Sequence, residues 1–183
     1  MGLSGEEWEK KFCRTQVWKA VPPYFFTRIF ISYGSEKSAL MFIGEYHYTI
    51  DDKGRLSIPV GYRTDLSNGA VVTRGLDHTL FLYPKEQWES LAAKIAALPL
   101  NQADTRAFAR LMLAGAMEVS IDKSGRIVVP EYLRTYASLS KKAVISGLYD
   151  RLEIWDEDAW NSYAAKTEAT GDEIAERLAP LGL

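Results

Sequence analysis

Two similar stretches, IDDKGRLSIP at 50–59 and IDKSGRIVVP at 121–130, carry the residue types best suited to binding chemistry. They lie 71 positions apart and share an aspartate, a glycine and an arginine at matching places: Asp51 and Asp122, Gly54 and Gly125, Arg55 and Arg126. The planar guanidinium of arginine binds phosphates or guanine edges through two parallel hydrogen bonds. The repeated stretch is therefore a candidate nucleic-acid contact.

The same residues also have a purely structural interpretation. Aspartate accepts hydrogen bonds from the backbone of a turn, glycine supplies a positive φ, and the arginine pairs with the aspartate beside it. In the binding interpretation, the turn carries arginine and lysine outward on a two-stranded ribbon that fits the major groove of DNA. The candidate DNA-contacting residues are then Arg55, Lys53, Asp51, Arg126, Lys123 and Asp122, with Gly54 and Gly125 forming the turns. Both interpretations hold together if each aspartate orients its arginine.

The repetition extends well beyond the two turns. GLDHTLFLYPKEQW at 75–88 parallels GLYDRLEIWDEDAW at 147–160, and the offset changes only between elements. A period of ~70 residues indicates a duplicated domain, because solenoid repeats are shorter. We expect a first repeat with a helical linker at 41–110 and a second repeat with C-terminal helices at 111–183.

Each repeat predicts the same order of short elements. A strand at 45–50 is expected to form a hairpin with RLSI, a short helix follows Pro59, and two strands and a helix at 84–98 come next. Further helices are expected at about 103–114 and at 156–168. One such unit has too little core to fold alone, and the chain offers no disulfide or metal to staple it. We therefore expect a mainly β fold with helices (α+β), in which two repeats interleave their hairpins into one pseudo-two-fold β-barrel with flanking helices.

Composition argues against several other classes of function. The single cysteine, Cys13, excludes an internal disulfide and a cysteine-based metal cluster, and His47 and His78 lack ligand spacing. We expect no metal, no cofactor and no catalytic site, since no nucleophile or phosphate-loop motif is present. The single cysteine fits a reducing cytoplasm, so a cytoplasmic protein is expected. No apolar run reaches the ~18 residues of a membrane span, so no membrane contact is expected.

Charge distinguishes the two halves. The net charge is −2 overall. Residues 41–110 carry 8 basic and 8 acidic side chains, whereas residues 111–183 carry 8 basic and 12 acidic ones. Acidic side chains repel the phosphates of DNA. We therefore expect the first hairpin, in the less acidic half, to dominate contact with DNA.

About residues 41–183 resemble the MraZ family of bacterial transcriptional regulators. The resemblance is carried by these segments: MFIGEYHYTIDDKGRLSIPVGYR, IDKSGRIVVPEYLR, GLDHTLFLYPKEQW, GLYDRLEIWDEDAW and GDEIAERLAPLGL. It implies two AbrB-like swapped-hairpin units and a ring-shaped homo-oligomer. It also implies a nucleoid-associated repressor that binds tandem DNA repeats upstream of the division and cell-wall gene cluster. Such a repressor also controls its own gene. The family's D-x-x-x-R contact falls on Asp51 with Arg55 and on Asp122 with Arg126.

Residues 1–40 depart from this pattern, because VWKAVPPYFFTRIFISYGSEKSAL has no counterpart in the repeat. We expect Met41 to be the native start, with 1–40 an upstream region read as protein. The alternative is a genuine extension, either a disordered arm or an oligomer contact. Two other functions stay open beside the regulator: a protein-interaction or assembly module without DNA binding, and a small barrel enzyme. Salt-dependent binding to repeat-containing DNA separates the first two.

Overall fold

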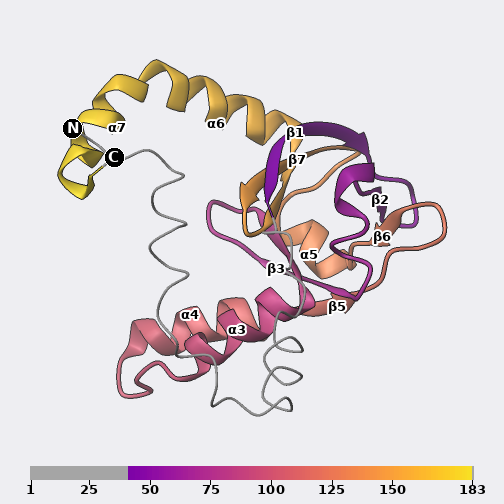
Figure 1. Cartoon of the computed structure of the whole chain (residues 1–183), viewed down its shortest axis with the longest axis horizontal. Coiled ribbons are helices and arrows are strands. Elements are labelled where there is room, and N and C mark those ends of the chain that lie inside the picture. Colours follow the sequence, from indigo (N-terminus) through magenta and orange to yellow (C-terminus); the bar gives the residue numbers. More distant parts are fainter. Residues whose placement is uncertain (1–40, 183) are drawn as a thin grey trace, which may run out of the picture. The chain divides into compact units, whose positions relative to one another are not determined.

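Antiparallel strands in two sheets form the centre of the described chain (Figure 1). The structure is a computed structural model that describes residues 41–182, so the expectation for residues 1–40 lies outside it. The larger sheet has the order β1-β7-β8-β4-β3-β5, and the smaller sheet pairs β2 with β6. The strands are β1 Phe42–Thr49, β2 Arg55–Ser57, β3 Ala70–Arg74, β4 Leu80–Pro84, β5 Met117–Val119, β6 Arg126–Val128, β7 Lys142–Tyr149 and β8 Leu152–Asp156.

Helices follow the strands at the predicted places. They are η1 Val60–Tyr62, α3 Lys85–Ala96, α4 Ala103–Leu113, α5 Glu131–Tyr136, α6 Glu157–Ala169, α7 Gly171–Leu178 and η2 Ala179–Leu181. The short helix after Pro59 is only a 3-10 turn, whereas its counterpart α5 is α-helical. Gly61 in the first repeat stands where the second has Tyr132, and glycine disfavours helix by about 1 kcal/mol. Within residues 41–182, no helix is long and apolar enough to span a membrane.

Two ladders stay within a repeat, β3 with β4 and β7 with β8. The strands that flank each hairpin turn pair mainly with the other repeat, and not with each other as the hairpin pattern predicts. β1 pairs along its whole length with β7 of the second repeat, and β5 pairs with β3 of the first. Within residues 41–182, the arms of the first hairpin meet beside the turn, at the bridge between Ile50 and Leu56 and at the Asp51 backbone N–H, which donates to the Arg55 carbonyl at 3.1 Å. The exchange has a physical reason: buried side chains of both repeats form one common core, which neither could complete alone.

Two registers reveal a pseudo-two-fold axis. In the β2–β6 ladder the central pair is Leu56 opposite Ile127, which are equivalent residues of the two repeats. In the β4–β8 ladder the central pair is Phe81 opposite Glu153, which are equivalent as well. A rotation that exchanges the repeats therefore maps both ladders onto themselves.

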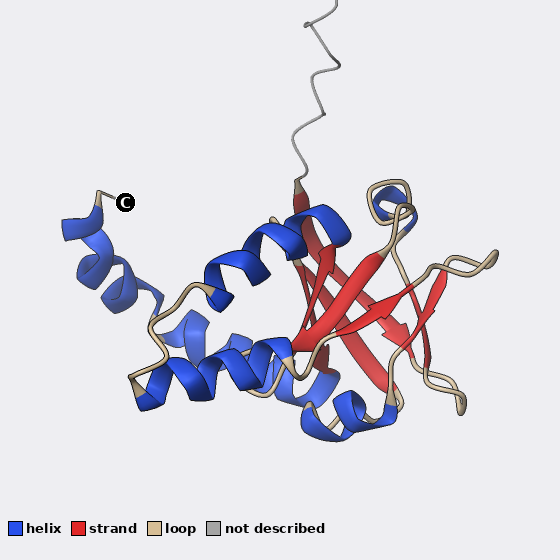
Figure 2. Cartoon of the chain, turned by 90° about the horizontal axis from the view of Figure 1, so that it is seen from below, coloured by secondary structure: helices blue, strands red, loops and turns tan. Residues whose placement is uncertain are grey.

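The fold is a mixed α and β structure around a largely antiparallel sheet. Closure into a barrel is not confirmed: within residues 41–182, β1 and β5 end the larger sheet without pairing to each other. The core between the sheets takes fully buried side chains from both repeats: Leu56, Ile58, Leu66, Leu80, Leu82, Ile127, Leu133, Ile145, Leu152 and Ile154. The two hairpin turns project from the same end of this body in both views (Figure 2).

Candidate nucleic-acid interface

The first hairpin turn is held closed by Asp51. Its Oδ1 accepts hydrogen bonds from the backbone N–H of Lys53 at 3.0 Å and of Arg55 at 2.9 Å. Its Oδ2 accepts from the side-chain Nε of Arg55 at 2.6 Å. The backbone N–H of Gly54 donates to the Asp51 carbonyl at 2.8 Å, which completes the turn. Asp51 thus both builds the turn and fixes the direction of the arginine.

The second turn repeats this geometry with one more bond. Asp122 Oδ1 accepts from the backbone N–H of Ser124 at 2.8 Å and of Arg126 at 3.0 Å. Its Oδ2 accepts from both Nε and Nη2 of Arg126, at 3.0 and 2.8 Å. Arg126 is therefore held through two nitrogens, whereas the hydrogen bonds of Arg55 to its aspartate use only Nε of the side chain.

Both carboxylates stay charged at neutral pH. The hydrogen bond from the Arg55 backbone is the largest cause that lowers the pKa of Asp51, and the Arg55 side chain adds to it. For Asp122, the Arg126 side chain is the largest cause of the lowered pKa. Both charge-assisted Asp–Arg pairs therefore persist at neutral pH, and they keep both guanidinium groups oriented.

The two turns interlock across the pseudo-two-fold. The Gly125 carbonyl accepts from the backbone N–H of Ile58 at 2.9 Å, and the Gly54 carbonyl accepts from Val129 at 2.8 Å. Both glycines have positive φ, 74° and 77°. A methyl group on Gly54 would lie 2.9 Å from the Val129 carbonyl oxygen, so these positions need glycine for space as well as for conformation.

Two arginines that the candidate set omitted lie directly against these turns. The Arg63 guanidinium covers Gly125, and the Arg134 Nε would be 3.0 Å from a methyl group on Gly54. Arg63 Nε donates to the Ile58 carbonyl at 2.9 Å, and Arg134 Nε donates to that of Val129 at 3.2 Å. Their recurrence at the same offset of 71 is the sequence signal that could have found them.

The remaining candidates lie at the tips. Lys53 and Lys123 are exposed, while Arg55 and Arg126 are about one-third exposed, at 33% and 30% of their side chains. The first turn carries one lysine and one arginine against Asp51 and Asp52, whereas the second carries the same cations against Asp122 alone. Local charge at the tips thus opposes the difference between the two halves of the chain.

The arrangement presents cations at the tips of both turns. In the described range, no three histidine, cysteine, aspartate or glutamate side chains come together as metal ligands. His47 bonds Glu157 at 3.1 Å and Glu45 at 3.0 Å on the surface, and these contacts raise its pKa, Glu157 most. What the turns offer is oriented guanidinium and ammonium groups, which recognise anions and base edges.

Fold and site together define a class of protein: two homologous repeats that interlock Asp-x-x-Gly-Arg turns about a pseudo-two-fold axis. The family model "MraZ protein, putative antitoxin-like" matches the chain twice, at residues 41–111 and 112–180. The chain belongs to the MraZ family.

Named relatives agree over nearly their full length. "Transcriptional regulator MraZ" of Carboxydothermus hydrogenoformans is 47% identical over 138 residues, covering 75% of this chain and 96% of the relative. The protein of the same name from Ligilactobacillus salivarius is 49% identical over 138 residues, with the same coverage. That from Acetivibrio thermocellus is 45% identical over 143 residues, covering 78% of this chain and all of the relative.

Proposed function

We propose that this protein is a sequence-specific transcriptional repressor that binds double-stranded DNA. Its targets are tandem short repeats upstream of the division and cell-wall gene cluster, including its own gene, and it acts in the cytoplasm on the nucleoid. Relatives named transcriptional regulators support the general role. The observation that carries the proposal is the pair of turns, each holding an arginine oriented by an aspartate at the same end of the body.

The proposed contacts divide by chemistry. Arg55 and Arg126 reach guanine edges or phosphates, because a guanidinium binds both through two donors. Lys53 and Lys123 act as point charges on phosphates, which position the protein without reading sequence. Asp51 and Asp122 orient the arginines, and Gly54 and Gly125 let the turns interlock. In this proposal β2 and β6 complete a swapped-hairpin barrel that holds both turns at a fixed spacing.

We expect the first hairpin to dominate contact with DNA. Arg55 holds Asp51 through Nε, which leaves both of its Nη groups outside that pair. Arg126 commits Nη2 as well as Nε to Asp122, so a base or phosphate must displace a bond there. We expect this difference in available donors to outweigh the single extra acidic residue at the first tip, because base recognition requires a directed donor and Asp52 contributes only a nearby charge.

A ring of identical copies supplies the affinity that one hairpin lacks. One ribbon reads only a few base pairs, and a chain of net charge −2 gains little from long-range attraction. Several hairpins in one particle meet several repeats at high effective concentration, which raises affinity by roughly 10²–10⁴-fold without any new contact.

Fluorescence anisotropy tests the proposal. The wild-type protein is added to labelled DNA that carries four tandem repeats from upstream of its own gene. The same titration is made with labelled scrambled DNA, and both are repeated over a series of salt concentrations. We expect tight binding to the repeats, with Arg55→Ala weakening it by about 5- to 150-fold, from the ~1–3 kcal/mol of one guanine contact. Arg126→Ala should weaken it less.

The matched control is Arg110→Ala, which removes the same charge from the exposed side of α4. It should leave repeat binding within about twofold of wild type, because only contacts at the turns carry base recognition. Equal affinity of the wild type for repeats and scrambled DNA at low salt would refute sequence-specific binding. Equal losses for the two turn variants would refute the dominance of the first hairpin alone.

A further inference from the structure

The outer face of the first repeat is closed by a helix. Thr73 on β3 and Phe81 on β4 face each other across that ladder, and α4 packs over them. Met112 is buried beside Phe81, and its carbonyl accepts from Thr73 Oγ1 at 2.6 Å. Met112 lies in the last turn of α4, where helix carbonyls lack intrahelical partners. Thr73 therefore supplies the bond that the helix end needs.

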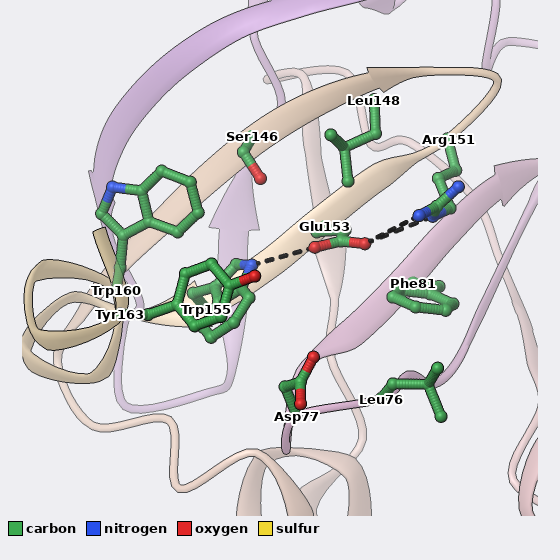
Figure 3. Close-up of a pocket in the computed structure, with 10 residues that line it drawn as sticks. All are labelled: Leu76, Asp77, Phe81, Ser146, Leu148, Arg151, Glu153, Trp155, Trp160 and Tyr163. Atoms are coloured by element: carbon green, nitrogen blue, oxygen red, sulfur yellow. Dashed lines mark hydrogen bonds and ion pairs between the residues drawn. The ribbon is translucent and has the colours of Figure 1, made fainter. Parts of the chain in front are cut away.

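The equivalent face of the second repeat has the same base without a cover. Ser146 on β7 faces Glu153 on β8 as Thr73 faces Phe81. The Ser146 side chain is buried, at 6% exposure, and within residues 41–182 its hydroxyl has no hydrogen-bond partner. A pocket of about 320 Å³ lies over it, with Leu148 on one side (Figure 3).

Glu153 and Arg151, the charged pair beside Ser146 in this pocket, already have partners. Glu153 accepts from Arg151 Nη2 at 3.1 Å and from the Trp155 indole at 3.2 Å. The Arg151 guanidinium also lies over the Phe81 ring, 4.8 Å from its centre. Ser146 is thus a buried unpaired donor in a largely apolar pocket. It suits an apolar side chain that carries a backbone carbonyl beside it, which is what Met112 brings to Thr73.

Helix α7 has the place in the second repeat that α4 has in the first. Both follow the helix after the fourth strand, and Ile174-Ala175 and Leu178 repeat the spacing of Phe108-Ala109 and Met112. Residues 97–102 let α4 turn back, whereas Thr170 alone separates α6 from α7. α7 therefore continues away from the strands and buries none of its residues (Figure 1).

We infer that α7 of a neighbouring copy fills the pocket over Ser146. Leu178 takes the place of Met112, and a carbonyl of the last turn of α7 accepts the Ser146 hydroxyl. Charge agrees with this occupant: Asp77 lines the pocket, Arg177 adjoins Leu178, and neither side chain has an ion pair within residues 41–182. The inference rests on the proposed function for its oligomer and names the surfaces that build it.

The contact joins two different surfaces, a helix on one copy and a pocket on the next. Such a head-to-tail interface repeats from copy to copy and closes into a ring or extends into a filament. It also makes a sharp prediction about mixtures. A copy with a damaged helix still offers its pocket, and a copy with a damaged pocket still offers its helix.

Native mass spectrometry of the full chain tests this with two variants. Leu178→Asp damages the exposed helix, and Leu148→Glu places a charge in the pocket, where the wild-type leucine is 41% exposed. We expect an oligomer from the wild type and single chains from each variant, with the contact weakened by roughly 30-fold or more. The equimolar mixture should give a complex of two chains, one of each variant. Leu100→Asp, at a leucine that is 73% exposed between α3 and α4, should keep the wild-type mass.

Complementation separates a lost contact from a lost fold, because a misfolded variant cannot restore a partner. Any of three results overturns the inference. They are a mixture of the two variants that stays monomeric, a Leu178→Asp chain that forms the wild-type oligomer, and a wild-type chain that is monomeric. The proposed function is judged separately: Arg55→Ala should keep the oligomer and lose DNA. An intact oligomer that does not bind the repeats would refute DNA recognition but would not contradict the α7 contact.

Discussion

Within each turn, one carboxylate both closes the hairpin and orients an arginine side chain. Asp51 and Asp122 accept backbone N–H groups that close the hairpin, and they also hold the side chain of the arginine four residues later. The structural and the binding interpretations of this motif are therefore one arrangement. The interlocked glycines explain why both turns carry glycine: a side chain at either position would collide with the other repeat.

Substitution of the second turn glycine tests this at the residue scale. Gly125→Ala should lower the free energy of unfolding by about 1–3 kcal/mol, because alanine is strained at φ 77° and its methyl group would overlap the Arg63 guanidinium. Urea denaturation followed by tryptophan fluorescence measures the change. Gly61→Ala is the matched control, with open space around it, and should raise stability by about 0.4–1 kcal/mol. Equal effects at both positions would contradict the interlocked turn.

Among the elements, the short β2–β6 ladder does more than its length suggests. It joins the two repeats on the pseudo-two-fold axis, and its central residues Leu56 and Ile127 are fully buried. The exchange of β1 and β5 between repeats joins them again at the edges of the larger sheet. With both links in place, we expect the repeats to unfold as one cooperative unit.

Truncation at this ladder gives the prediction at the element scale. Leu56→Ala should destabilise the whole chain by about 2–5 kcal/mol, since it leaves a cavity where both repeats meet. Val128→Ala, in the adjoining strand at 55% exposure, should change stability by less than about 0.5 kcal/mol. Circular dichroism and tryptophan fluorescence should report one shared transition for Leu56→Ala. Two separated transitions would mean that the repeats are independent domains.

At the scale of the whole molecule, the affinity for DNA depends on how the weak contacts of several hairpin turns combine. Each chain presents two turns at one end, and the proposed ring would multiply them in a fixed geometry. Recognition should then depend on the number and phase of DNA repeats more than on any single contact.

Varying the number of repeats tests this at the scale of the assembly. We expect DNA with four repeats to bind about 10²–10⁴-fold more tightly than DNA with one repeat in the same length of duplex. The Leu178→Asp chain should bind both duplexes alike and weakly, because it keeps its turns and loses its neighbours. Anisotropy at fixed salt gives the ratio. A wild-type ratio near one would show that a single chain carries the full affinity.

The sequence by itself determined the duplication, the place of nearly every helix and strand, and the chemistry of the two turns. These are local properties: aspartate and glycine at fixed spacing specify a turn, and apolar periodicity specifies a strand or helix wherever the chain goes. The repeat also gave the offset at which Arg63 and Arg134 recur, although only the structure shows both of them against the opposite turn.

Only the tertiary structure decided which strands pair. The hairpin pattern predicts β1 beside its own return strand, yet β1 pairs with β7 across about a hundred residues, because long-range pairing depends on how the two repeats pack together. The same holds for the helices after each sheet half. α3–α4 and α6–α7 read alike in sequence, but the length of one connection sends α4 back onto the sheet and α7 away from it. Local sequence sets the elements, and the geometry of the shared core sets their partners.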